Sequence, residues 1–272
     1  MDTTGRKSLF VLGSVLCMIL FDSCSTVELT GRRQLTAIPN DQMVTLGKET
    51  YQQVLEEQQI SRNREYTGTV QGVGQRISAA VEEYMRQNGM GDRIGDYAWE
   101  YRVLESDAVN AWCLPGGKIA FDEGIMPVCR DDAGVATVMA HEVAHVIAQH
   151  SNERLSQQLA VQLGGIALSE AIEKEKESTK QLAMLAFGIG SQVGVLLPYS
   201  RTHEKEADVM GLYFMAMAGY DPREAPDLWH RMKERQQNQV PEFISTHPNP
   251  DTRIQNLNKH MARALEYYNR PR

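Results

Sequence analysis

Residues 138–148 have the sequence VMAHEVAHVIA, an apolar segment that contains two histidines and a glutamate. On a helix, side chains four residues apart lie one turn above each other, so His141 and His145 direct two imidazoles to one point. Glu142 lies one position along, where its carboxylate can hold a water molecule bound to an ion at that point. These polar groups interrupt an otherwise apolar helix, where burying them is costly. The pattern therefore predicts a zinc site.

Two histidines do not complete a catalytic zinc site, which needs a third protein ligand and one open position. The three-histidine motif HExxHxxGxxH is absent, because position 148 is Ala and His150 follows His145 by five residues, not six. The third ligand is therefore expected to be a carboxylate on a later helix. Glu170 and Glu173 are candidates by their distance along the sequence, but they lie at the start of a charged segment.

Glu204 is the better candidate for the third ligand. It opens the sequence EKEAD at residues 204–208, in which Glu204 and Asp208 share one face of a helix. That spacing places Glu204 at the metal and Asp208 one turn further on. From there Asp208 is expected to accept the remaining N–H of a ligand histidine.

The hydrophobic pattern predicts one α+β domain, predominantly helical, with a small β-sheet before the helix that carries the two histidines. Strands are expected over residues 97–104, 109–113 and 118–121, the last two joined by a turn at LPGG. Residues 182–198 carry no charge and are expected to form a buried or site-covering helix, with a membrane segment as the alternative. The helices expected elsewhere cover residues 40–59, 67–88, 131–150, 151–172, 202–218, a segment from 221 and 251–268.

The N-terminus has the layout of a secretory signal. Arg6 and Lys7 precede an apolar run at residues 9–21, which is shorter than the roughly 20 residues that span a bilayer. Cys24 follows a small residue and resembles the lipidated cysteine of bacterial lipoproteins. We therefore expect a signal peptide at residues 1–23 and lipidation at Cys24, with an ordinary cleaved signal or an uncleaved anchor as alternatives. An extended segment at residues 24–39 and one domain at residues 40–272, which carries the predicted zinc site, are expected to follow.

Composition narrows the function classes. The 272 residues include 28 Lys and Arg against 35 Asp and Glu, a net charge of −7 that argues against a nucleic-acid partner. The four cysteines contain no CxxC pair, which excludes a cysteine-rich zinc ribbon. Cys113 and Cys129 either pair as a disulfide or remain buried thiols.

Four motifs together resemble the zinc metallopeptidase family of HtpX, Oma1 and the type I CAAX prenyl endopeptidases. They are HEVAH at 141–145, YSRTHEKEAD at 199–208, NAWCLPGG at 110–117 and THP at 246–248. The resemblance covers roughly residues 40–260, and the signal at the N-terminus makes the chain look like the soluble periplasmic lipoprotein branch.

The resemblance implies a zincin-like fold of the gluzincin type. It places His141, His145 and Glu204 on one zinc ion, with Glu142 as the catalytic carboxylate. Asn110 and Ala111 are then expected on the strand that receives the substrate. His247 is expected near the metal, either as a donor to the transition state or as a fourth ligand that blocks the open position. Arg201 and Arg253 are left open, since either can pair with a carboxylate or bind an oxyanion.

The function implied is a zinc endopeptidase that cleaves misfolded or stalled envelope proteins. Its partners are expected to be unfolded protein substrates, a membrane reached through the lipid anchor and the outer-membrane assembly machinery. We expect a periplasm-facing lipoprotein of the outer membrane. The main alternative is a chaperone for outer-membrane proteins with a mostly closed metal site, although such a module has no need of Glu142. An integral membrane protease is the third possibility.

Overall fold

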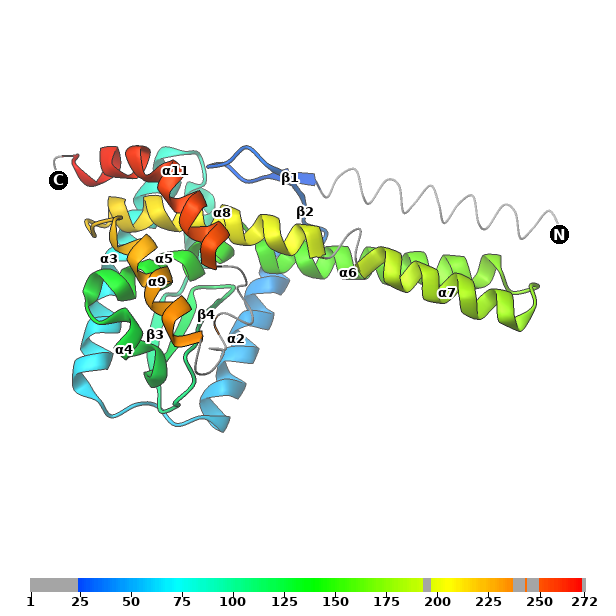
Figure 1. Cartoon of the computed structure of the whole chain (residues 1–272), viewed down its shortest axis with the longest axis horizontal. Coiled ribbons are helices and arrows are strands. Elements are labelled where there is room, and N and C mark those ends of the chain that lie inside the picture. Colours follow the sequence, from blue (N-terminus) through cyan, green and yellow to red (C-terminus); the bar gives the residue numbers. More distant parts are fainter. Residues whose placement is uncertain (1–23, 193–196, 237–242, 244–249, 271–272) are drawn as a thin grey trace. The chain divides into compact units, whose positions relative to one another are not determined.

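The computed structural model describes residues 24–192, 197–236, 243 and 250–270. The chain divides into two compact units. The larger consists of residues 41–148 and 202–272, and the smaller consists of residues 1–40 and 149–201. The two imidazoles of the HEVAH motif belong to the larger unit, which is drawn with its sheet and helices in Figure 1.

The larger unit contains a three-stranded sheet in the order β3 (Glu100–Leu104), β5 (Lys118–Asp122), β4 (Ala111–Leu114). Strand β5 is parallel to β3 and antiparallel to β4. In the turn that joins β4 to β5, Gly116 and Gly117 have φ angles of 86° and 78°, a region that favours glycine. The three predicted strands and their glycine turn are confirmed, although the first strand begins later than predicted.

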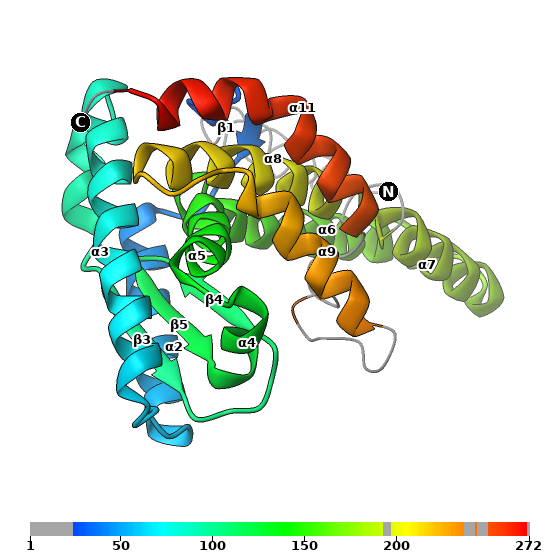
Figure 2. The ribbon, with the colours of Figure 1, turned by 60° about the vertical axis from the view of Figure 1, so that its left-hand side comes forward.

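Helices cover this sheet. Figure 2 shows the helix with the HEVAH motif, α5, between the sheet and the later helices, with α3 packed against both α5 and β3. Apolar side chains from α3, α5 and β5 are fully buried here and form the core of the unit. The helices described for this unit, two of which begin before its borders, are α2 (Asn40–Glu57), α3 (Arg64–Gln87), α4 (Met126–Cys129), α5 (Asp132–Ile147), α8 (Leu197–Met217), α9 (Glu224–Gln236) and α11 (Pro250–Tyr268), with 3-10 turns at Gly91–Asp96 and Glu123–Ile125.

Both ends of α5 have local causes. The Asp131 side chain accepts a hydrogen bond from the backbone N–H of Gly134 at 3.0 Å and caps the first turn, as the sequence predicts. The helix ends at Ile147, earlier than the predicted His150, because Gln149 adopts a left-handed conformation with a φ of 58°. The HEVAH motif therefore occupies the last turns of α5.

Helix α8 packs unusually close to α5. A Cβ atom on Gly211 would lie 2.9 Å from the backbone N and 3.0 Å from the Cα of His141, so a side chain at this position would push the two helices apart. Glu204 lies seven residues earlier on α8, which is about two helical turns. The glycine contact therefore sets how near Glu204 comes to the histidines.

The smaller unit pairs a hairpin with two helices. Strands β1 (Cys24–Thr26) and β2 (Arg33–Leu35) are antiparallel, and the helices are α6 (His150–Ala171) and α7 (Glu177–Ser191). Arg32 forms an ion pair with the buried Glu153 at 2.7 Å, and the backbone N–H of Ala37 donates to Ser156 Oγ at 2.8 Å. These bonds attach the segment after β1 to α6.

Helix α7 covers much of the uncharged stretch for which a buried or site-covering helix was predicted. Burial is wrong for Leu182 and Leu185, which are 68% and 61% exposed. The packing that α7 does make is against α6, where Gly164 and Gly165 leave room for the ring of Phe187. None of the helices in the described parts of the chain combines the length and the apolar composition that crossing a bilayer requires.

We predict that Gly211→Ala lowers stability by about 1–3 kcal/mol, because the added methyl group meets the backbone of α5. Gly72→Ala in α3 is the matched control: its Cβ meets nothing within 4 Å, and replacing a helical glycine there is expected to stabilise by up to ~1 kcal/mol. Thermal unfolding of both variants measures the difference. Equal stability of the two would show that the close approach of the helices is not needed.

Candidate metal centre

Helices α5 and α8 bring three candidate ligands together. His141, His145 and Glu204 are buried, and each offers one ligand atom such that all three atoms lie within 4.8 Å of one another. The two Nε2 atoms are 3.1 Å apart. Glu204 reaches both rings, with Oε2 at 3.5 Å from His141 Nε2 and Oε1 at 3.5 Å from His145 Nε2.

This donor set fits a tetrahedral metal ion. Ligand atoms held tetrahedrally at about 2.0–2.1 Å from zinc lie roughly 3.4 Å from one another. The two nitrogens are 3.1 Å apart and each oxygen of Glu204 lies 3.5 Å from one of them, so every one of these contacts is near that value. Buried carboxylates at Glu204 and Asp208 lie beside a single guanidinium, that of Arg253, so a cation bound here would meet excess negative charge.

Glu142 is buried on the next position of α5 and lies beside strand β4. Burial, with the Glu142 charge as a second cause, raises the pKa of the Cys113 thiol on β4 well above its ordinary value. Burial also raises the pKa of Cys129, to about 12. Both cysteines are free thiols, and neither is reactive in this protonated form. The Glu142 charge thus acts on β4, the strand expected to receive substrate, from the helix that carries the two histidines.

Asp208 lies behind His141, as the spacing of the EKEAD sequence predicts. Its Oδ1 is 3.3 Å from His141 Nδ1. Burial and the Arg253 charge lower the pKa of His141, but hydrogen bonds to Asp208 and Glu204 and the Glu204 charge outweigh them, so its pKa is raised. Arg253 Nε donates to both oxygens of Asp208 at 3.0 Å, which decides the question that the sequence left open for this arginine.

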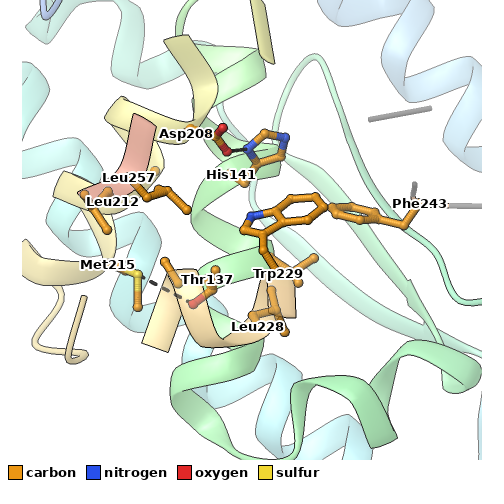
Figure 3. Close-up of a pocket in the computed structure, with 12 residues that line it drawn as sticks. Thr137, His141, Asp208, Leu212, Met215, Leu228, Trp229, Phe243 and Leu257 are labelled. Carbon is orange, nitrogen blue, oxygen red and sulfur yellow. Dashed lines mark hydrogen bonds and ion pairs between the residues drawn. The ribbon is translucent and has the colours of Figure 1, made fainter. Parts of the chain in front are cut away.

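Two aromatic residues near His141 have no signal in the sequence. Figure 3 shows Trp229 of α9 with its ring beside that of Phe243, and the two rings stack with centres 5.7 Å apart. Phe243 also meets the His141 ring edge-on at 6.2 Å. With Leu212, Met215 and Leu257 they line a cavity of about 10 Å³, which is room for roughly one water molecule.

Strand β4 lies at one side of the sheet, and its backbone groups alternate in direction. The carbonyl of Asn110 accepts a hydrogen bond from Asp122 of β5 at 3.0 Å, so it faces into the sheet. Ala111 is offset by one residue, and its backbone groups therefore face the outer edge. The backbone N–H of Phe243 donates to the carbonyl of Val109 on that same edge at 3.0 Å.

The remaining predicted residues do not join this cluster. Glu170 and Glu173 are exposed in the smaller unit, and Arg201 is also exposed. Cys24 is an exposed residue of β1. His247 lies outside the residues that the structure describes.

A helix that carries HExxH, completed by a buried glutamate from a second helix, defines a metallopeptidase. The chain belongs to peptidase family M48, whose model matches residues 71–261. It is therefore a metalloendopeptidase, as its relatives are.

Curated relatives agree with this assignment. The mitochondrial metalloendopeptidase OMA1 of Schizosaccharomyces pombe is 32% identical over 246 residues, covering 90% of this chain and 68% of the relative. The enzyme of the same name from Saccharomyces cerevisiae is 29% identical over 98% of this chain and 78% of its own length. A putative beta-barrel assembly-enhancing protease of Vibrio cholerae is 29% identical over 56% of this chain and 32% of its own length.

Glu204→Ala is expected to lose most of the bound metal, because two imidazoles alone leave the ion under-coordinated. Glu170→Ala, which removes an exposed carboxylate of α6, is the matched control and should retain the metal. Elemental analysis of the purified variants gives the metal content per chain. Full occupancy in Glu204→Ala would transfer the ligand role to another residue.

Proposed function

We propose that the chain is a zinc-dependent endopeptidase in which one ion is held by His141, His145 and Glu204. The observation that carries this proposal is the convergence of these three buried side chains beside Glu142, with the two Nε2 atoms 3.1 Å apart and each Glu204 oxygen 3.5 Å from one of them. Buried imidazoles and carboxylates at these separations are costly unless something binds them. A chaperone does not require a carboxylate at Glu142, so the arrangement favours the enzyme.

A zinc ion held by His141, His145 and Glu204 would supply a Lewis acid for the scissile carbonyl and for the attacking water. Glu142 accepts the proton of that water and then delivers it to the leaving amine. Its position on the ligand helix α5, which packs against β4, suits this transfer. Asp208 orients the His141 ring by accepting from Nδ1, which leaves Nε2 for the ion.

The substrate is proposed to lie extended along the outer edge of β4. Ala111 presents its backbone N–H and carbonyl to that edge, since the alternate residues bond to β5. An extended peptide can add main-chain hydrogen bonds there as a further strand. Such binding needs an unfolded segment of about strand length, which fits misfolded or stalled proteins as substrates.

The segment that contains Phe243 is proposed to shut this site. Phe243 bonds to Val109 on the edge proposed for the substrate, and its ring stacks on Trp229 near His141. The cavity left beside it holds about one water molecule, which is too little for a substrate side chain. His247 follows four residues later and is proposed to cap the metal in the resting state.

We also propose that the chain is a lipoprotein of the bacterial outer membrane, facing the periplasm, with Cys24 lipidated after removal of residues 1–23. The relative in Vibrio cholerae, named as an assembly-enhancing protease, supports clients among envelope proteins and contact with the outer-membrane assembly machinery. The OMA1 relatives bear mitochondrial names, so the location rests on the signal-like N-terminus of this chain.

Glu142→Gln is expected to keep the fold and the zinc and to lower proteolysis of a casein-like unfolded substrate by about 10²–10⁴-fold, because an amide does not accept the proton of water. Glu83→Gln, on the exposed face of α3, is the control and should cleave as wild type does. Equal rates for all three proteins would mean that the cleavage comes from a contaminant.

His247→Ala and Phe243→Ala are each expected to cleave a loosely folded substrate several-fold faster than wild type while retaining zinc. His247→Ala removes the proposed cap on the metal, and Phe243→Ala removes the side chain proposed to shut the substrate edge. His230→Ala, on an exposed position of α9, is the control. A large loss of cleavage with zinc retained in His247→Ala would instead make His247 a donor to the tetrahedral intermediate. An unchanged rate would remove it from the mechanism.

Cys24→Ala is expected to release the mature chain from the membrane fraction, because a lipidated cysteine supplies the proposed anchor. Fractionation of cells that express either form, followed by mass spectrometry of the N-terminal peptide, measures location and modification together. A membrane-bound Cys24→Ala protein with residues 1–23 retained would point to an uncleaved anchor instead.

A further inference from the structure

Arg253 on α11 is an arginine that is 2% exposed, although arginine is rarely buried unless it is paired. Its guanidinium meets side chains from two other helices. Asp208 of α8 accepts a hydrogen bond from Nε at 3.0 Å and also forms a close ion pair with Nη2. One edge of the guanidinium, with its Nε and Nη2 donors, therefore binds a single carboxylate. Trp229 of α9 lies under the guanidinium, with Cζ 3.7 Å from the ring centre.

The same guanidinium borders two of the proposed metal ligands. Nη1 lies 3.3 Å from Glu204 Oε2, and Nη2 lies 2.8 Å from His141 Nδ1. Nη2 also lies 3.1 Å from His141 Nε2, the ring atom proposed to bind the metal. Any turn of the arginine side chain therefore moves the groups that set the metal geometry.

We propose that Arg253 is a positioning residue, which fixes Asp208 and the Glu204 carboxylate so that they hold the metal ligands in a binding geometry. This inference rests on the proposed function, because it takes His141, His145 and Glu204 as the ligands. Its direct partner is Asp208, whose carboxylate would otherwise be free to rotate away from His141 Nδ1.

A role as a donor to the reaction intermediate fits the contacts less well. The Nη1 atom is buried, one face of the guanidinium is covered by Trp229, and Nε and Nη2 are bonded to Asp208. Arg253 thus acts through the carboxylates and not on the substrate. Holding the Asp208 carboxylate in this way requires the planar guanidinium, because lysine offers a single ammonium group in place of two parallel N–H donors.

The test compares Arg253→Lys, Asp208→Asn and the double variant in the full chain, with zinc affinity measured by competition against a chelator. Arg253→Lys and Asp208→Asn are each expected to weaken zinc binding by about 10–100-fold. The double variant should lose less zinc affinity than the product of the two single losses, because both changes break the Arg253–Asp208 interaction. Arg263→Lys, an exposed arginine on the same helix, is the control and should bind zinc as wild type does.

Thermal unfolding of the metal-free proteins separates a loss of fold from a loss of positioning. If Arg253→Lys does not fold, Trp229→Leu takes its place, since it removes the stacked face and should weaken zinc binding several-fold. Zinc affinity within twofold of wild type in a folded Arg253→Lys protein would overturn the inference, as would losses that multiply in the double variant. A wild-type chain that binds no zinc would overturn the proposed function itself.

Discussion

Charge buried between helices α5 and α8 is the constraint on which the structure depends. Two imidazoles and a glutamate carboxylate converge there, with the two Nε2 atoms 3.1 Å apart and each carboxylate oxygen 3.5 Å from one of them, and none of the three side chains is more than 8% exposed. Moving such groups out of water costs several kcal/mol each unless they are paired or bind an ion. The surrounding helices hold these groups in place.

Three contacts keep these groups in place, and each comes from a different part of the chain. Gly211 allows α8 to approach the backbone of α5 at His141. Asp131 caps the start of α5, so the helix that carries both histidines begins at a defined residue. Arg253 joins α11 to Asp208, and its stacking on Trp229 adds α9. The metal centre is therefore the meeting point of four helices, although only two of them supply ligands.

Much of this was accessible from the sequence because it depends on local spacing. HEVAH places its histidines four apart on a helix, and EKEAD gives Glu204 and Asp208 the same relation, so both pairs could be predicted as neighbours. The glycine turn between β4 and β5 was visible for the same reason. Contacts between distant segments could not be predicted in this way. The sequence left two roles open for Arg253, of which pairing with a carboxylate was one. No spacing in the sequence indicates that Trp229 stacks on Phe243. The exposed Leu182 shows the limit of reading burial from apolar composition.

Zinc K-edge X-ray absorption on the purified chain tests the central claim most directly. The account predicts a first shell with two imidazole nitrogens at about 2.0–2.1 Å and carboxylate oxygen at about 2.0–2.2 Å, with no sulfur, in a roughly tetrahedral set. One further light atom would complete the shell, from water or from a third imidazole. A shell that contains sulfur near 2.3 Å, or a single imidazole, would contradict the assignment of His141, His145 and Glu204 as the ligands.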